Sequence, residues 1–399
     1  MIRVAFVGSS GHSETAFQHI YESLEPAAEA VAYCKAYPGE DLKDLSYKAG
    51  EYLLLKMSVY EDLDLMLDEV KPDVLVVDGR YGEHGAHAEA ALKRGISVFT
   101  DKPMALDEEQ LVHLHDVAKE HGCTFWSMQT MRFYPDIVTA KQLANEKTIG
   151  RLRMITVQKS YSFGRRPAWM GDAKLYGGTL PWVGIHGIDM IRFFSERAIL
   201  HGTAMKSAAH NRGLGDFETT AVMSLQLEDD VLAQVQVDMH LPEHYIPQGE
   251  NRIRIVGTEG IVEVTNGKVL LTNAEVYRQE MPLQSVPMGL FTCFLFDLQA
   301  RQSKQGVFAF VNETVKRQMT RGLSNRECLY LNRVVLRLNE AAECGERIQM
   351  VDIFEKERQE KEALRQLAEQ EAEKALAEQE RSMRERLERA RKKRQEKKD

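Results

Sequence analysis

Residues 177–189 read GGTLPWVGIHGID, a glycine-led turn followed by a predicted helix whose side chains could do chemistry. Trp182, His186 and Asp189 have the spacing that places side chains on one face of an α-helix. His186 could relay a proton or bind a hydroxyl, and Asp189 could bind polyol hydroxyls or fix the tautomer of the imidazole. A core histidine that is satisfied by a neighbouring group is the alternative interpretation of His186.

A lysine lies at the end of a predicted strand earlier in the chain. Lys102 stands between Asp101 and Pro103, directly after the strand predicted at 97–100, at the carboxyl edge where open α/β sheets bind ligands. Pro103 restricts Lys102 to extended conformations and so limits the direction of its side chain. A partly desolvated lysine here could act as general acid or base toward a hydroxyl. A solvated loop lysine is the alternative.

The first 130 residues alternate short apolar runs with helical patterns. Strands are predicted at 2–8, 30–34, 74–77, 97–100 and 124–127, and helices at 13–24, 59–69, 85–94 and 107–121. This alternation predicts parallel βαβ units and an N-terminal Rossmann domain with a doubly wound parallel sheet. Asp107, followed by two glutamates, is typical of a helix N-terminus.

From about residue 150 the pattern changes to alternating strands. These are predicted at 152–160, 218–227, 231–240, 253–257 and 260–264, followed by helices at 289–322 and 324–344. The pattern predicts an α/β domain with a large, mostly antiparallel open sheet that has one covered and one available face. Because a wide apolar face rarely stays exposed, a homo-oligomer (dimer or tetramer) is expected to form through this sheet.

The turn after the first predicted strand is placed to bind a dinucleotide. It contains Gly8, Ser9, Ser10, Gly11 and His12 and opens a helix, so its backbone N–H groups could face a pyrophosphate. Serines at positions 10 and 13 replace two glycines of the usual G-x-G-x-x-G pattern. An ordinary tight turn that binds nothing is the alternative.

Two further sites bear on the cofactor. Lys35, at the end of the second strand, could attract the 2′-phosphate of NADP(H) or be a solvated loop lysine, while Glu40 and Asp41 lie several residues beyond the place where an acid would bind ribose. Gly79 and Arg80, after the third strand, are expected to line the nicotinamide side. NAD and NADP therefore both remain open.

Composition excludes several classes of protein. The chain has 399 residues, 43% of them hydrophobic, and a net charge of −8, so no global basic field points to nucleic acid or an acidic membrane. No apolar stretch approaches the roughly 20 residues that span a bilayer, and no signal peptide precedes the first strand. The five scattered cysteines predict reduced thiols in a cytoplasmic protein, with no metal site.

Residues 351–399 differ in composition from the rest of the chain. They combine many Lys, Arg and Glu residues with no Gly or Pro, and Glu–Lys/Arg pairs recur four residues apart. A charged helical tail is predicted, either a solvated extension or a coiled-coil or partner-binding helix. The expected domains are thus 1–128 (Rossmann), 129–350 (α/β, substrate binding and oligomerisation) and 351–399 (tail).

Five motifs follow one another in the order typical of a known family. VAFVG before the first turn, DKP at 101–103, RFYP at 132–135, GGxxxxxGxHxxD at 177–189 and VGTEG at 256–260 resemble the Gfo/Idh/MocA oxidoreductases (glucose–fructose oxidoreductase and inositol dehydrogenase). The resemblance covers roughly residues 1–350. It implies a Rossmann domain, a second domain with an open sheet that commonly mediates oligomers, and hydride transfer between NAD(P) and a sugar, cyclitol or similar polyol.

The resemblance assigns roles to particular positions. The catalytic lysine of the family falls on Lys102, within a cofactor-binding segment that also includes Asp101 and Pro103, and the catalytic histidine falls on His186. The substrate-binding acid falls on Asp189. The catalytic aspartate of the family, however, falls on Trp182, which could stack on a sugar or mark the loss of activity.

Two residues at positions to which the resemblance assigns no catalytic role are also candidate substrate-binding groups. Asp172 is a candidate substitute carboxylate, and Trp169 resembles an aromatic residue that members of the family place near the substrate.

Three functions follow from these patterns. The first is an NAD(P)-dependent oxidoreductase acting on a secondary alcohol of a sugar or polyol. The second is a non-catalytic relative that serves as a ligand sensor or assembly partner, which Trp182 favours. The third is lyase or hydrolase chemistry through transient oxidation by NAD, which occurs in the wider family.

Overall fold

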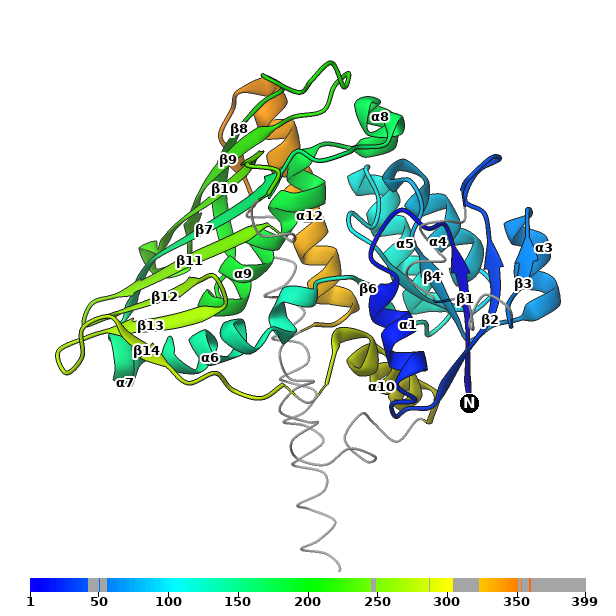
Figure 1. The fold of residues 1–399 in the computed structure, drawn as a ribbon, viewed down its shortest axis with the longest axis horizontal. Helices are drawn as coiled ribbons and strands as arrows, with labels where there is room; N and C mark the ends of the chain where they lie inside the picture. The colour runs from blue at the N-terminus through cyan, green and yellow to red at the C-terminus, as the bar shows by residue number, and fades with distance from the viewer. Residues whose placement is uncertain are drawn as a thin grey trace, which may run out of the picture. The chain divides into compact units, whose positions relative to one another are not determined.

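The computed structural model describes residues 1–41, 50, 56–244, 249–286, 288–303, 323–350, 353 and 359 (Figure 1). Met1–Gln349 form one compact unit. The predicted charged tail lies outside the described residues except for positions 353 and 359, as does the part of the predicted helix 289–322 that follows residue 303.

The first sheet has six parallel strands in the order β3-β2-β1-β4-β5-β6. This is the predicted doubly wound Rossmann sheet, and the strand order reverses between β1 and β4, where open sheets bind ligands. The start of the helix predicted at 59–69 was wrong, because residues 58–60 form a short edge strand. This strand has an exposed valine and no alternating pattern that would have indicated it. The strands are β1 (Ile2–Val7), β2 (Ala28–Cys34), β3 (Ser58–Tyr60), β4 (Val74–Val77), β5 (Ser97–Thr100) and β6 (Phe125–Ser127).

Helices from two distant parts of the chain pack on this sheet. Asp107 caps α5 as predicted, since its carboxylate accepts a 2.7 Å hydrogen bond from the Gln110 amide. Phe291 and Phe294, from α10, pack against Phe99 of β5 with ring centroids 5.1 Å apart in each pair. The helices are α1 (Glu14–Tyr21), α3 (Leu63–Val70), α4 (His84–Leu92), α5 (Glu108–Glu120) and α10 (Leu290–Ser303).

The second sheet has nine strands in the order β14-β13-β12-β11-β7-β10-β9-β8-β15. Only the β7–β10 pair is parallel, so the predicted mostly antiparallel sheet is confirmed. The strands are β7 (Leu152–Ser162), β8 (Ile199–Ser207), β9 (Thr220–Leu227), β10 (Leu232–Leu241), β11 (Glu250–Gly257), β12 (Ile261–Thr265), β13 (Lys268–Thr272), β14 (Gln279–Met281) and β15 (Ile348–Gln349).

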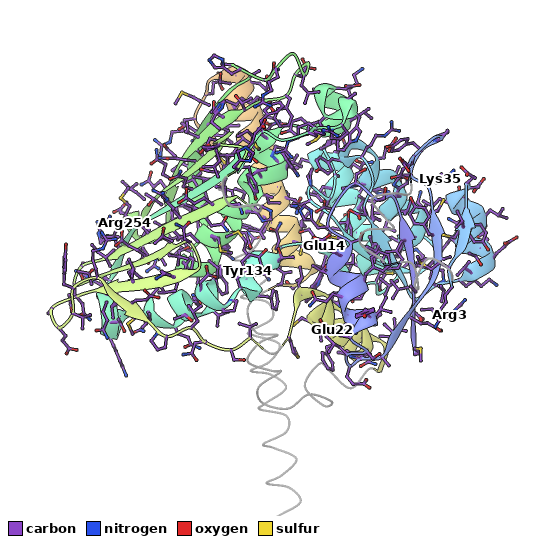
Figure 2. All side chains as sticks on the ribbon, viewed as in Figure 1. Arg3, Glu14, Glu22, Lys35, Tyr134 and Arg254 are labelled. Carbon is purple, nitrogen blue, oxygen red and sulfur yellow. The ribbon has the colours of Figure 1, made fainter. Side chains whose placement is uncertain are left out.

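Helices cover one face of the nine-stranded sheet and leave the other open (Figure 1). The covered face is apolar, and the central part of the open face is polar. Arg254 lies on this open face (Figure 2), and it pairs across the strands with Thr156, which in turn pairs with Gln234. Exposed Met154 and Leu232 lie toward one end of that face. The helices of this half of the unit are α6 (Pro135–Leu143), α7 (Glu146–Ile149), α8 (Ala173–Tyr176), α9 (Ile185–Ser195) and α12 (Asn325–Cys344).

The part of the chain that the structure describes contains no helix with the length and apolarity needed to span a membrane.

Candidate active site

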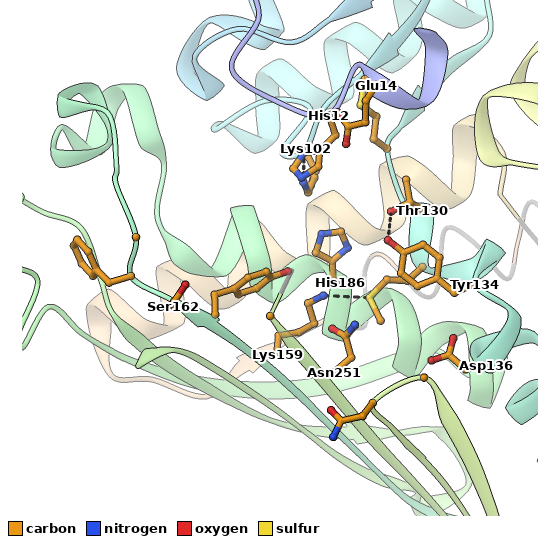
Figure 3. A pocket seen from close by; sticks show the side chains of 18 of the residues that line it. His12, Glu14, Lys102, Thr130, Tyr134, Asp136, Lys159, Ser162, His186 and Asn251 are labelled. Carbon is orange, nitrogen blue, oxygen red and sulfur yellow. Dashed lines mark hydrogen bonds between the residues drawn. The ribbon is translucent and has the colours of Figure 1, made fainter. Parts of the chain in front are cut away.

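A pocket of about 750 Å³ brings together residues from both sheets (Figure 3). The turn after β1 and the tip of β5 contribute one wall, and β7 and α9 contribute the opposite side. Lys102 and His186, the two predicted catalytic residues, both line it. The cationic side chains on its wall include Lys102, Lys159, Arg165 and Arg166.

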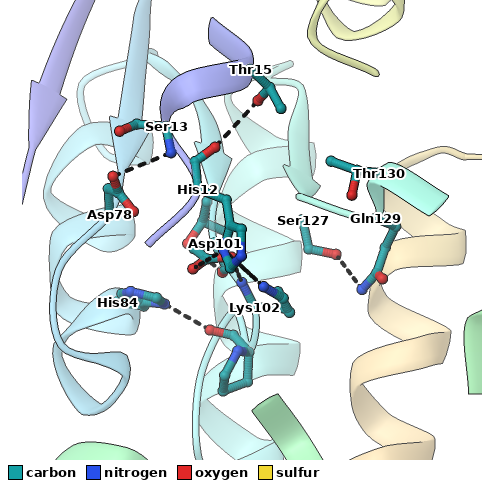
Figure 4. Close-up of polar contacts among 12 residues, drawn as sticks. His12, Ser13, Thr15, Asp78, His84, Asp101, Lys102, Ser127, Gln129 and Thr130 are labelled. Carbon is teal, nitrogen blue, oxygen red and sulfur yellow. Dashed lines mark hydrogen bonds and ion pairs between the residues drawn. The ribbon is translucent and has the colours of Figure 1, made fainter. Parts of the chain in front are cut away.

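The tip of β5 is fixed by a histidine. The His84 ring lies 2.8 Å from the carbonyl oxygen of Pro103 through Nδ1 and 3.0 Å from that of Gly79 through Nε2 (Figure 4). Because this ring bridges the segments after β4 and β5, it limits the movement of the backbone next to Lys102.

Lys102 has a carboxylate within hydrogen-bond reach, and that carboxylate is its neighbour Asp101. Lys102 Nζ lies 3.1 Å from Asp101 Oδ1 and 2.9 Å from His12 Nδ1, which itself lies 3.0 Å from Asp101 Oδ2 (Figure 4). Burial acts to raise the pKa of Asp101, but Lys102 and His12 outweigh it and hold that pKa well below the usual range. The glycine turn and the DKP motif are therefore joined through one buried, ionised carboxylate.

His186 enters the pocket from the first turn of α9 and is almost completely buried. Its Nδ1 has no hydrogen-bond partner among the described residues. Burial, followed by the charges of Lys159 and Lys102, holds the pKa of His186 well below the ordinary value. The imidazole is therefore neutral near pH 7, the state in which it can accept a proton.

Trp182 and His186 do not share the α-helical register that their spacing suggests. Leu180–Gly184 form one turn of π-helix, and α9 begins only at Ile185, so the wider turn changes the phase between the two side chains. Trp182 stacks on Tyr81, with ring centroids 6.1 Å apart, and is absent from the wall of the pocket.

The other two aromatic or acidic candidates also lie off the pocket wall. Trp169 packs edge-to-face on Tyr81, with centroids 5.1 Å apart. Asp172 is exposed and caps the short helix α8, where its carboxylate accepts a 2.9 Å hydrogen bond from the Lys174 amide. The structure therefore does not bring Asp172 together with Lys102.

Asp189 is completely buried in an ion-pair network away from the pocket wall. Its Oδ1 accepts a 2.7 Å hydrogen bond from Arg132 Nε, and Arg132 also pairs with Glu327 of α12 at 3.0 Å. Burial raises the pKa of Asp189 to about 6, although the guanidinium of Arg132 opposes this shift. The network connects α9 and α12 with the RFYP motif.

The Gly8–His12 turn has the close backbone packing of a dinucleotide-binding turn. Gly8 has a φ of +80°, and a Cβ at this position would lie 2.5 Å from the Cα of Gly79. A Cβ on Gly11 would collide with the carboxylates of Asp78 and Asp101. Both positions thus require glycine.

The N–H groups of this turn have several partners within the protein. The Ser9 amide donates to Glu40 at 2.9 Å, and the Ser10 amide donates to the Asp78 carbonyl at 2.7 Å. The His12 amide, at the start of α1, makes no hydrogen bond within the described part of the chain. A diphosphate therefore fits at this last N–H group and the N-terminus of α1.

The predicted cofactor residues at the strand tips have ionic partners of their own. Lys35 pairs with Glu61. Arg80 donates a 2.9 Å hydrogen bond from Nε to Glu83 and lies over the ring of Tyr37, 4.0 Å from its centroid. Neither Lys35 nor Arg80 lines the pocket.

Sequence reasoning missed the part played by Glu40. This buried carboxylate folds back toward the glycine turn and also accepts hydrogen bonds from Tyr33 (3.2 Å) and the Ala36 amide (2.7 Å). No local pattern indicates this return, because it depends on the path of the loop after β2.

Sequence reasoning also missed Lys159, which lines the pocket from β7. A signal was present here, because the alternation of β7 puts Lys159 on the same face as Ile155 and Val157.

The described chain thus combines a parallel Rossmann sheet, a large open sheet and one pocket whose wall includes both Lys102 and His186. Residues 2–129 match the family model "Oxidoreductase family, NAD-binding Rossmann fold", and residues 137–263 match "GFO/IDH/MocA C-terminal domain". The chain belongs to the Gfo/Idh/MocA family, as the sequence motifs predicted.

Individual relatives agree with this assignment. A solved structure from Thermotoga maritima is 31% identical and has a TM-score of 0.77, over 88% of this chain and 100% of the other. Inositol 2-dehydrogenase 2 of Saccharopolyspora erythraea is 26% identical over 54% of this chain and 61% of that protein. D-glucoside 3-dehydrogenase of Escherichia coli is 24% identical over 59% and 66%, respectively. The matches thus span about three fifths of these curated relatives.

Proposed function

We propose that this protein is an NAD-dependent oxidoreductase that oxidises or forms a secondary alcohol in a sugar, cyclitol or related polyol. The observation that carries the proposal is that Lys102 and neutral His186 both line one pocket beside the glycine turn. The names of the inositol and glucoside dehydrogenases among its relatives support the substrate class.

The chain's own residues would hold NAD around the turn after β1. The His12 amide and the N-terminus of α1 would face the diphosphate. NAD, when bound, supplies the acceptor for the hydride of the alcohol carbon. Glu40 places a buried carboxylate next to Ser9, and Glu61 neutralises Lys35, so this region repels the additional 2′-phosphate of NADP.

Lys102 and His186 would each interact with the reacting hydroxyl group of the substrate. His186, neutral because it is buried among cations, accepts the hydroxyl proton. Lys102 Nζ donates a hydrogen bond to the same oxygen and stabilises the negative charge that develops on it. Asp101 and His12 hold Lys102 in position.

Cofactor titration followed by a substrate panel tests this proposal. NADH is expected to bind at least about tenfold more tightly than NADPH, because the carboxylate of Glu40 opposes the 2′-phosphate. Reduction of NAD by members of a cyclitol and aldose panel would support the oxidoreductase. If neither cofactor binds at millimolar concentration, the proposal is wrong. Binding without turnover of any substrate would favour the non-catalytic sensor instead.

The pH dependence of the reaction tests the role of His186. An ordinary histidine, with a pKa near 6.5, would be about three-quarters protonated at pH 6. A reaction that needs its neutral form would therefore slow about fourfold between pH 7.5 and pH 6. Because the pKa of His186 is lowered, the imidazole stays neutral as the pH falls through this range, and kcat/KM for alcohol oxidation is expected to change less than about twofold between pH 7.5 and 6. Initial rates across this range measure it, and an inflection near pH 6.5 that His186→Gln abolishes would contradict it.

A further inference from the structure

Lys159 is a buried cation in the wall of the pocket. It lies on the covered face of β7, in line with Ile155 and Val157, and only 5% of the residue is exposed. Its cross-strand neighbours are Val237 on β10 and Asn251 on β11, neither of which carries a charge. The fold therefore presents one ammonium group to the pocket from an otherwise apolar or neutral surface.

This ammonium has no carboxylate partner in the part of the chain that the structure describes. Lys159 Nζ lies 3.5 Å from the sulfur of Met131 and 5.2 Å from the centroid of the Tyr161 ring (Figure 3). The Tyr161 hydroxyl also hydrogen-bonds with Lys159, but neither residue supplies a negative charge to balance the ammonium. Burying a charge without a counter-charge is strongly unfavourable, so such a group points to a missing anion.

A second cation on the same wall is also without a carboxylate among the described residues. Arg166 donates from one terminal nitrogen to the carbonyl of Ser162 at 3.2 Å, and its guanidinium lies over the Trp182 ring, 5.1 Å from the centroid. Its Nε is buried and has no partner. Arg166 thus adds positive potential to the pocket and keeps one N–H donor unused.

The carboxylates on the pocket wall do not neutralise these cations. Glu14 is exposed, and Asp136 accepts a hydrogen bond from the Ile137 amide at 2.8 Å. Among the described residues, neither acid pairs with Lys159 or Arg166. Tyr161 responds to the positive potential: burial raises the pKa of its hydroxyl, yet Lys159 and Lys102 bring that pKa below the ordinary value.

We infer that the substrate carries a carboxylate group, which Lys159 binds together with the Tyr161 hydroxyl and the Arg166 Nε–H, while Lys102 and His186 act on a hydroxyl of the same molecule. Lys159 and Tyr161 lie on one face of β7 and hydrogen-bond with each other, so both can contact one carboxylate, the ammonium as a charged donor and the hydroxyl as a neutral one. The single ammonium group of Lys159 matches the single negative charge of a carboxylate. Arg166 already donates to a backbone carbonyl, so it cannot bind a phosphate dianion with all of its N–H donors. The inference rests on the proposed function and narrows its substrate class to sugar acids.

Binding of matched acid and neutral sugars tests this inference. D-Glucuronate, D-galacturonate and D-gluconate are compared with D-glucose, D-galactose and D-glucitol, and glucose 6-phosphate serves as the phosphate probe. Calorimetry is carried out on the full chain with and without NADH. At least one acid is expected to bind about 10–100-fold more tightly than its neutral counterpart, the range of a charged hydrogen bond.

Variants of Lys159 identify the group responsible. Lys159→Met is expected to abolish the preference for the acid, and Lys159→Arg to keep part of it. Lys147→Met removes an equal charge from an exposed site on α7 and is expected to change nothing. Without ligand, the Lys159→Met protein is expected to be at least as thermostable as the parent, because it no longer buries an unpaired charge.

Each other outcome overturns the inference. These outcomes are the absence of binding of any acid at millimolar concentration, equal binding of acids and neutral sugars, tighter binding of the phosphate probe, and a preference that survives Lys159→Met. Failure of the proposed function looks different, because NADH itself then fails to bind, whereas the comparison of acid and neutral sugars without NADH still reports on Lys159.

Discussion

Substituting methionine for Lys102 is expected to lower kcat/KM for alcohol oxidation by about 10²–10³-fold, the range lost when one hydrogen-bond donor to a developing negative charge is removed. The side chain of Lys102 is 3% exposed, and its ammonium lies between Asp101 and His12 at the pocket wall. Methionine retains most of the volume and removes the hydrogen-bond donor. NADH affinity is expected to change by less than about threefold, since in the proposed binding mode the diphosphate would contact the turn rather than Lys102. Steady-state kinetics and NADH titration measure the two effects separately.

Two controls sharpen the Lys102 experiment. Lys119→Met alters an exposed lysine on α5 and is expected to leave kcat/KM unchanged. The double variant Lys102→Met/His186→Gln is expected to lose little more than the worse single variant, because the two groups act on one proton transfer. If Lys102→Met keeps more than about a tenth of the parent activity, Lys102 does not have the catalytic role proposed for it.

The second large effect is expected at the buried ion pair between Arg132 and Asp189. Arg132→Leu is expected to lower the free energy of unfolding by about 3–5 kcal/mol, because it leaves the buried Asp189 without its ionic partner, so the carboxyl must either stay charged or take up a proton. Urea denaturation, with the midpoint and the slope fitted together, measures the loss. Asp189→Asn alone also removes the ion pair. The double variant Arg132→Leu/Asp189→Asn is expected to be more stable than Arg132→Leu, because no carboxylate is left at position 189 without a partner.

The same variants decide between two roles for Asp189. A substrate-binding residue would raise KM on substitution by asparagine while the unfolding free energy stayed near that of the parent. The position of Asp189 away from the pocket wall leads us to expect the reverse, a loss of stability with KM little changed in the folded protein. A stability loss below about 1 kcal/mol in Arg132→Leu would contradict the buried-pair argument.

The fold was predictable because its main signals are local. Buried parallel strands such as Val74–Val77 are short apolar runs, and the strands of the second sheet alternate. The three-residue β3 and the irregular β8 lack these patterns and were missed. The position of Lys102 was predictable for the same reason, since the end of a strand and a following proline are both sequence features.

The partners of the site residues were not predictable, because they come from distant segments. Nothing local indicates that His12 meets Lys102, or that Arg132 rather than a substrate occupies Asp189. The i, i+4 argument for Trp182 assumed an α-helix, and the π-helical turn invalidates it. Lys159 differs from these cases. It occupies a position in β7 where the alternation predicts a buried apolar residue, so the sequence alone could have indicated that this lysine is unusual.

The packing of α10 against β5 affects whether the Rossmann domain can fold as an isolated fragment. Phe291 and Phe294 lie in the same core as Phe99 and Trp126, although more than half of the described chain separates them in sequence. A fragment that stops at residue 128 would leave this apolar surface in water, at a cost of about 1.5–3 kcal/mol for each large side chain left without cover. The Rossmann half is thus completed only after the second sheet has been synthesised, and it is not a self-sufficient module for transfer to another protein.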